Sequence, residues 1–178
     1  NAGSSHVEDI GDDRLSDVLE AGRYLATSDP ADLAAFDVAV VSVPTPMGDG
    51  APDLSYIESA SQSLAPHVRP GCTVILESTT YPGTTEELAG PILEAGSGLT
   101  AGVDFHLGYS PERIDPGNAQ FRLENTPKVV SGVNDSSLAA VQRFFDRLVE
   151  RTIPVSGTRE AEMAKLLENT FRHVNIAL

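Results

Sequence analysis

The sequence predicts an α/β fold with a doubly wound parallel sheet. Short apolar runs rich in β-branched residues alternate with segments whose apolar residues have helical spacing, which is the order of βαβ units. The runs are apolar at consecutive positions, as expected of strands buried on both faces of a parallel sheet. Three runs end in polar loops. Open α/β sheets bind their ligands outside the carboxyl ends of the strands, so these loops are where a functional site is expected.

Five runs are expected to be strands, and right-handed crossovers would connect them into one parallel sheet. The first is a continuous β-branched run, the second is bounded by a turn and a polar loop, and the third alternates before a stiff loop. The last two are short runs on either side of a helix. They span residues 37–43, 73–77, 103–109, 128–132 and 152–155.

Six helices are expected around these strands, at residues 14–21, 31–36, 54–65, from 84 or 85 to about 96, 136–149 and 158–178. Capping side chains precede several of them, namely Asp29, Asp53, Asn134 or Asp135, and Thr158. Gly22 closes the first helix. The fourth helix has glutamates in its first turn, which the helix dipole favours, and Pro91 should kink or shorten it.

The composition is that of one globular domain. The chain has 178 residues, of which 40% are hydrophobic and 21% charged, enough for a core and unlike a disordered chain. No apolar run approaches the roughly 18 residues needed to cross a bilayer, and residues 1–5 lack the basic and apolar regions of a signal peptide. We therefore expect a cytoplasmic protein.

Charge and cysteine content limit the partners and the chemistry. Twelve basic against twenty-six acidic residues give a net charge of −14, which argues against nucleic acids and anionic membranes as partners. An anionic substrate would need a local cluster of positive groups. Cys72 is the single cysteine, so no intrachain disulfide can form, and we interpret it as a small buried core residue. No histidine pair has metal-ligand spacing, so no metal site is expected.

The candidate site combines three loops and the last helix. Pro44–Thr45–Pro46, Ser78–Thr79–Thr80 and Ser110–Pro111–Glu112–Arg113 each follow a predicted strand, so all three should lie at one edge of the sheet. In the last helix Lys165 and Asn169 share one face. That face is either simply solvated, or it borders the cleft, where a lysine can stabilise an oxyanion and an asparagine can donate beside it.

Both ends of the chain look cut. No G-x-G-x-x-G fingerprint occurs in the 178 residues, although a doubly wound nucleotide domain would be expected to open with one. The last helix stops in mid-pattern. We therefore expect a fragment, or a chain without its first strand–helix unit.

Four motifs together resemble the UDP-glucose/GDP-mannose dehydrogenase family. They are Val-Pro-Thr-Pro at 43–46, Glu-Ser-Thr at 77–79, Tyr-Ser-Pro-Glu-Arg at 109–113 followed by Pro-Gly-Asn at 116–118, and Ala-Glu-Met-Ala-Lys-Leu-Leu-Glu-Asn-Thr at 161–170. The loop after the third strand is more similar to the branch that acts on UDP-N-acetylhexosamines than to UDP-glucose enzymes. The resemblance runs over nearly the whole chain and implies a Rossmann-like NAD-binding domain at residues 1–157, with 158–178 starting a long central helix.

The resemblance implies a chemistry and a set of site residues. Such enzymes oxidise C6 of the sugar to a carboxylate by two hydride transfers to NAD, for surface polysaccharide synthesis, and they are homodimers. By position Thr45 would lie near NAD, and Thr79 would contact the cofactor and hold the catalytic water. Glu112 would be the acid/base carboxylate. Lys165 would stabilise the oxyanion, assisted by Asn169.

The chain departs from the family pattern at some positions. Pro116 stands where the family has a second loop glutamate, and Asp115 is a weak substitute. The nucleophilic cysteine and the sugar-binding domain would follow residue 178, so this chain alone is expected to be inactive. The alternatives are a UDP-glucose 6-dehydrogenase, a hydroxyacid dehydrogenase of the 6-phosphogluconate type, which also pairs a lysine with an asparagine four residues on, and a stand-alone nucleotide-binding module.

Overall fold

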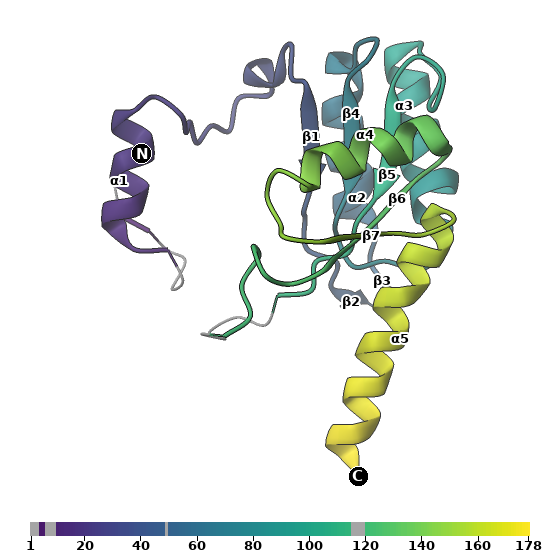
Figure 1. The fold of residues 1–178 in the computed structure, drawn as a ribbon. Helices are drawn as coiled ribbons and strands as arrows, with labels where there is room; N and C mark the ends of the chain where they lie inside the picture. Colours follow the sequence, from purple (N-terminus) through teal and green to yellow (C-terminus); the bar gives the residue numbers. More distant parts are fainter. Residues whose placement is uncertain (1–3, 6–9, 49, 115–119) are drawn as a thin grey trace.

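A five-stranded sheet lies at the centre of the computed structural model, which describes residues 4–5, 10–48, 50–114 and 120–178. The strands lie in the order β1-β4-β5-β6-β7 (Figure 1). They are β1 (Val38–Val41), β4 (Thr73–Leu76), β5 (His106–Tyr109), β6 (Lys128–Gly132) and β7 (Thr152–Pro154). A small antiparallel hairpin of β2 (Met47–Gly48) and β3 (Ala51–Pro52) replaces the irregular glycine-rich loop that the sequence suggests after β1.

Helices cover both faces of this sheet (Figure 1). α2 and α3 pack on one face and α4 on the other, so that successive β4 residues enter different core clusters: Val74 and Leu76 join one, Ile75 the other. The helical elements are α1 (Asp12–Glu20), η1 (Pro30–Leu33), α2 (Ser55–Leu64), η2 (Ala65–His67), η3 (Thr84–Ala89), α3 (Gly90–Ser97), α4 (Asp135–Phe145) and α5 (Thr158–Ala177). No helix in the described ranges is long and apolar enough to span a membrane.

The strands β1, β4 and β5 are parallel, as the apolar runs predict. Val41 pairs with Leu76, and Leu76 pairs with Tyr109, so the three strands end at the same level. All four residues of β4 are buried, which is the burial expected of a central strand covered by helices on both faces.

The prediction of an entirely parallel sheet is wrong at one pair. β5 and β6 are antiparallel, with Tyr109 opposite Ser131, whereas β6 and β7 are parallel to each other. The described residues of the β5–β6 connection contain no helix, so the chain does not cross back over the sheet before β6 begins. Gly108 permits this close pairing, because a Cβ there would lie 2.3 Å from the Ser131 carbonyl oxygen and 2.6 Å from Val141.

Two of the predicted helix caps are confirmed, and two are not. Asp29 and Asn134 cap η1 and α4 as expected. Asp53 bonds the N–H of Ser55 at 2.9 Å, although α2 begins only at Ser55. Thr158 is the first residue of α5 rather than its cap, and its hydroxyl bonds Glu86 at 2.5 Å instead.

The expected helix after β4 is two elements. η3 is a π-helical turn, and α3 begins at Gly90 with Pro91 in its first turn. Pro91 has no N–H with which to continue the hydrogen bonds of η3, and it is tolerated in the first turn of α3, where that N–H would lack a partner within the helix.

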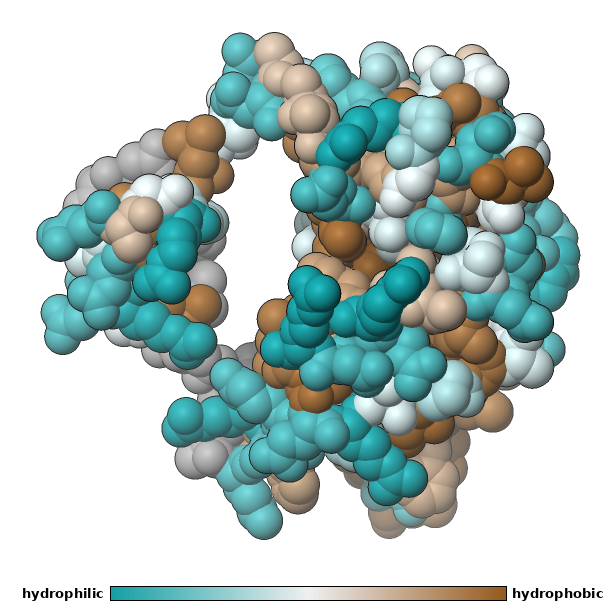
Figure 2. Space-filling model, turned by 45° about the horizontal axis from the view of Figure 1, so that its top comes forward, coloured by the Kyte–Doolittle hydropathy of each residue, from teal (hydrophilic) through white to brown (hydrophobic). Residues whose placement is uncertain are grey.

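Near the N-terminus, α1 has no buried residue and stands apart from the sheet (Figures 1 and 2).

Candidate functional site

The carboxyl ends of β1, β4 and β5 bring the three predicted loops to one edge of the sheet. Ser78, after β4, donates from its hydroxyl to the carbonyl oxygen of Val43 at 2.8 Å, which ties the β4 loop to the end of β1. The Tyr109 hydroxyl donates to the carbonyl oxygen of Ser78 at 3.2 Å, which ties the same loop to β5. Hydrogen bonds from side-chain hydroxyls to main-chain carbonyl oxygens therefore fix the loops relative to one another.

Two threonine hydroxyls at this edge make no hydrogen bond with the residues that the structure describes. The Thr45 Oγ1 atom is buried and has no hydrogen bond within the described part of the chain. The Thr79 side chain is exposed beyond the end of β4. A buried hydroxyl without a partner is uncommon in folded proteins, so the Thr45 hydroxyl fits a position that a ligand satisfies.

Glu112 and Lys165 meet, although 53 residues separate them. Both are half-buried. The Lys165 Nζ donates to the main-chain carbonyl oxygen of Glu112, and the Glu112 carboxylate accepts from the N–H of Ile114. The last helix therefore borders the candidate site, which is the condition on which a chemical role for Lys165 depends.

Asn169 is half-buried and lies one turn beyond Lys165 on α5. Its amide makes no hydrogen bond with the described residues, so it is available to a ligand but is not held against Glu112 or Thr79. Asp115 and Pro116 lie outside the described residues.

Lys128 and Glu77 form an ion pair at this edge of the sheet. The sequence did not lead us to predict this pair. Their side chains are 5% and 17% exposed. The Lys128 Nζ also donates to the Pro111 carbonyl oxygen at 3.1 Å and lies 4.9 Å from the ring centre of Phe145. The available signal was a lysine at the start of an apolar strand in a chain with only two lysines.

Arg113 is a second residue without a predicted role. Its guanidinium pairs with Glu168 on α5 at 2.7 Å and donates to the carbonyl oxygen of Pro127 at 2.7 Å. Arg113 is paired with Glu168 and Lys128 with Glu77, so among the described residues Lys165 is the cation at this edge that bonds a neutral carbonyl oxygen instead of a carboxylate. The charges of Arg113 and Lys128 are therefore offset by their partners, and these two residues do not supply the local positive cluster that an anionic substrate would need.

Glu162 is the third missed residue. Its side chain is completely buried and accepts hydrogen bonds from the N–H groups of Gly83 and Thr85 at 2.5 and 2.9 Å and from the Thr85 hydroxyl at 2.7 Å. Burial raises the pKa of this carboxyl above its ordinary value, against the hydrogen bonds, which lower it. The sequence signal was a glutamate three residues before Lys165, on the same helix face.

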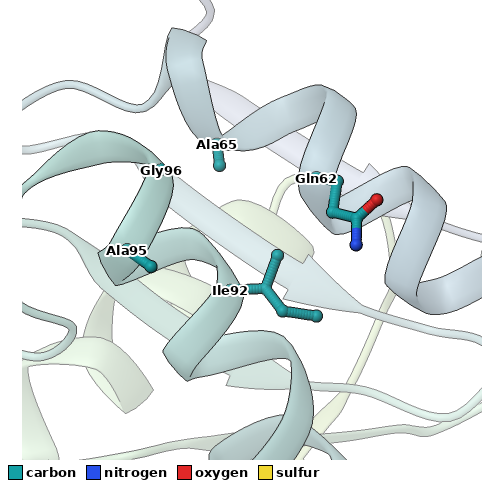
Figure 3. Close-up of a pocket in the computed structure, with 5 residues that line it drawn as sticks. All are labelled: Gln62, Ala65, Ile92, Ala95 and Gly96. Carbon is teal, nitrogen blue, oxygen red and sulfur yellow. The ribbon is translucent and has the colours of Figure 1, made fainter.

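A shallow groove of about 390 Å³ lies elsewhere, between α2–η2 and α3 (Figure 3). Its lining is Gln62, Ala65, Ile92, Ala95 and Gly96. These residues belong to α2, η2 and α3. The groove is therefore separate from the three loops.

Comparisons with known proteins identify the family. The model of the UDP-glucose/GDP-mannose dehydrogenase family, NAD binding domain, matches residues 1–172. A UDP-N-acetyl-D-mannosamine dehydrogenase of Pyrococcus horikoshii is 39% identical over all of this chain and 43% of its own length. A UDP-N-acetyl-D-glucosamine 6-dehydrogenase of Pseudomonas aeruginosa is 40% identical over 92% of this chain and 39% of its own length. The chain thus spans about two fifths of these relatives.

Solved structures agree. The UDP-D-ManNAc dehydrogenase structure from Pyrococcus horikoshii superposes with a TM-score of 0.92 at 38% identity, over 99% of this chain and 42% of that one. A ternary complex of GDP-mannose dehydrogenase from Pseudomonas aeruginosa gives a TM-score of 0.87 at 26% identity, over 98% and 41%. The unpartnered Thr45 hydroxyl and the exposed Thr79 fit NAD as the ligand of this edge. The chain belongs to the UDP-glucose/GDP-mannose dehydrogenase family and is similar to its NAD-binding domain.

Proposed function

We propose that this chain is part of an enzyme that oxidises the C6 hydroxyl of a UDP-N-acetylhexosamine, UDP-ManNAc or UDP-GlcNAc, to the uronic acid. Two successive hydride transfers to NAD would produce a precursor for surface polysaccharide. The observation that carries the proposal is Lys165, which α5 places against Glu112 at the ligand edge of the sheet. The names of relatives that are 39% and 40% identical support the choice of sugar.

Each residue of the edge has a proposed role. Thr45 and Thr79 contact NAD, which supplies the hydride acceptor when it is bound. Thr79 also holds a water molecule, and Glu112 moves the proton as general acid and base. Lys165 stabilises negative charge on the reacting oxygen, and Asn169 donates beside it and contacts the sugar. The support is positional: Lys165 lies against Glu112, and the polar groups of Thr45, Thr79 and Asn169 make no hydrogen bond within the described ranges.

Lys165 must exchange one hydrogen bond to act. Its ammonium group contacts the Glu112 carbonyl oxygen, a neutral acceptor. A developing alkoxide is charged and therefore a stronger acceptor, so the lysine gains interaction energy as the oxygen loses its proton. Such a gain accelerates the reaction, because it is larger in the transition state than before it.

The organisation of the whole protein belongs to the same proposal. Residues 1–157 form the NAD-binding unit, and residues 158–178 begin the central helix that leads to the rest of the protein. We place this enzyme in the cytoplasm as a homodimer. The family resemblance supports both statements.

The test is turnover by the natural full-length protein. Purified enzyme is supplied with NAD and, in turn, UDP-ManNAc, UDP-GlcNAc, UDP-glucose, GDP-mannose and 6-phosphogluconate, and NADH and sugar products are counted. We expect two NADH per N-acetylhexosamine. Exclusive oxidation of 6-phosphogluconate or UDP-glucose would overturn the proposed substrate.

One variant tests the proposed machinery. Lys165→Ala is expected to reduce kcat about 100- to 1,000-fold, as when one donor to an oxyanion is removed. Arg143→Ala is the matched control, because Arg143 is exposed on α4 and belongs to no part of the site. Near-normal turnover of Lys165→Ala would contradict the assigned role.

A further inference from the structure

Glu162 connects helix α5 to the segment that follows Thr79. The Glu162 carboxylate is inaccessible to water, and its three donors all belong to Gly83 and Thr85. Sequence separations of 77 and 79 residues lie between the partners. The carboxylate is therefore the point at which two distant parts of the candidate site are joined.

The donors are groups that need this partner. Gly83 and Thr85 lie at the start of the π-helical turn η3, which has no side-chain cap of its own. The first N–H groups of a helical turn lack partners within it, and their dipoles favour a negative charge. Gly83 has a φ of +103°, which aims the chain in a direction that residues with a side chain rarely adopt. Glu162 thus serves as a cap supplied by another helix.

The segment between Thr79 and η3 is linked to this cap by further bonds. The Thr80 hydroxyl donates to the Thr84 hydroxyl at 2.5 Å, and the Thr84 hydroxyl donates to the Tyr81 carbonyl oxygen at 2.9 Å. Both Thr80 and Thr84 are buried. A displacement of η3 is therefore transmitted through this chain of bonds to the residue beside Thr80, which is Thr79.

At its other end the connection reaches Lys165. Glu162 and Lys165 are three residues apart on α5, so they lie on the same face of a rigid helix. Glu162 bonds η3 and Lys165 bonds the loop after β5. The position and rotation of α5 at Glu162 consequently set where the Lys165 ammonium lies relative to Thr79.

We infer that Glu162 is a positioning residue of this site: by capping η3 from α5, it fixes the distance between the Thr79 hydroxyl and the Lys165 ammonium. The inference rests on the proposed function for the chemistry of those two groups. Glu162 is completely buried and is therefore not expected to touch substrate or cofactor. An apolar side chain of the same volume would fill its place but leave two buried N–H groups without acceptors.

The experiment compares two isosteric variants of the full-length protein with one control. Glu162→Gln places an NH2 group where a carboxylate oxygen accepted bonds, and Thr85→Val removes one donor from the opposite side. Glu160→Gln makes the same charge change two residues away on α5, where the side chain is exposed. For each variant kcat, both KM values, the affinity for NAD and the thermal midpoint are measured.

We expect Glu162→Gln to lower kcat about 10- to 100-fold, the loss typical of residues that orient catalytic groups. The KM for the sugar nucleotide should stay within about twofold, because uniform substrate binding is untouched. Thr85→Val should lower kcat less, and Glu160→Gln should leave it unchanged. A kcat of Glu162→Gln within about twofold of the unaltered enzyme overturns the inference, as does a loss that only follows the fraction of unfolded protein.

A second readout separates this inference from the proposed function. Amide hydrogen exchange is measured below the thermal midpoint on peptides that contain residues 79–85 and 163–169. In Glu162→Gln both peptides should exchange faster than in Glu160→Gln, while peptides from α4 are unaffected. Faster exchange in both peptides supports the positioning role of Glu162 even if no nucleotide sugar is oxidised. A lack of oxidation would refute only the proposed function. Unchanged exchange in these peptides refutes the positioning role of Glu162.

Discussion

Arg113 and Glu168 join the loop after β5 to helix α5 through an ion pair of 2.7 Å, across 55 residues of sequence. The guanidinium also holds the carbonyl oxygen of Pro127, just before β6 begins. The two side chains are 26% and 44% exposed. Partly exposed pairs contribute little stability because water and salt screen them. The value of this pair is therefore that it selects one arrangement of the loop.

A double-mutant cycle tests this interpretation. Arg113→Ala, Glu168→Ala and the double variant are compared by urea unfolding, and we expect a coupling free energy of about 0.5 kcal/mol. The coupling should decline at 1 M salt, where the screening length is roughly 3 Å. A coupling above about 2 kcal/mol that does not respond to salt would show that the pair is effectively buried.

The Lys128–Glu77 pair should behave in the opposite way. Both side chains are largely buried, so Lys128→Met leaves the Glu77 charge and the Pro111 carbonyl oxygen without their donor. We expect a loss of about 3–5 kcal/mol in the free energy of unfolding, measured with urea. The double variant Lys128→Met with Glu77→Gln should recover part of the loss. If the single and double variants unfold alike, the unpaired charge is not the cause.

Alkaline stability should depend on Tyr109. Burial, with Glu162 and Glu77 nearby, raises the pKa of its phenol above the ordinary value of about 10. Above that pH the unfolded chain releases the proton while the folded chain keeps it, so the free energy of unfolding falls as pH rises. The slope from this one group is at most about 1.4 kcal/mol per pH unit. Tyr109→Phe lacks it, so the stability gap between protein and variant should narrow from pH 9 to pH 11. Parallel curves would contradict the shift.

Cys72 should react slowly in the folded protein. It is 3% exposed, and burial raises the pKa of its thiol, which confirms the interpretation of this cysteine as a core residue. A thiol reagent should modify it about 100-fold more slowly than glutathione, which corresponds to an opening free energy of about 2.7 kcal/mol. In denaturant the two rates should converge. Because the chain has a single cysteine, all labelling reports on Cys72. Rapid labelling of the folded protein would contradict the prediction and show that the core opens readily at the start of β4.

Much of the fold follows from local sequence. The β-branched runs at β1, β4 and β6 and the caps Asp29 and Asn134 are local signals, and the structure confirms them. The direction of β6 is not a local property, because it depends on whether a helix intervenes after β5. An apolar run has the same pattern in both directions, and the only signal for the antiparallel pair was that no helix is expected between residues 109 and 128.

The candidate site could likewise be predicted only in part. Parallel strands must end at one edge, so the meeting of the three loops is predictable without any contact information. Glu162, Lys128 and Arg113 act through partners 51 to 79 residues away. Each is an ordinary charged residue in its own segment, and periodicity describes only neighbours along the helix or strand. Their importance is visible only after the chain is folded.

The reversal between β5 and β6 has a consequence for how such a protein can diversify. Residues 110–127 connect β5 to β6 at one edge of the sheet. Two hydrogen bonds hold the ends of this connection together: the Ser110 hydroxyl donates to the Val129 carbonyl oxygen, and the Ser131 hydroxyl donates to the Tyr109 carbonyl oxygen. The free-energy cost of closing a loop grows only slowly with its length. A change in the length of this segment would therefore cost the fold little free energy, provided that the contacts of Glu112 and Arg113 with α5 are kept.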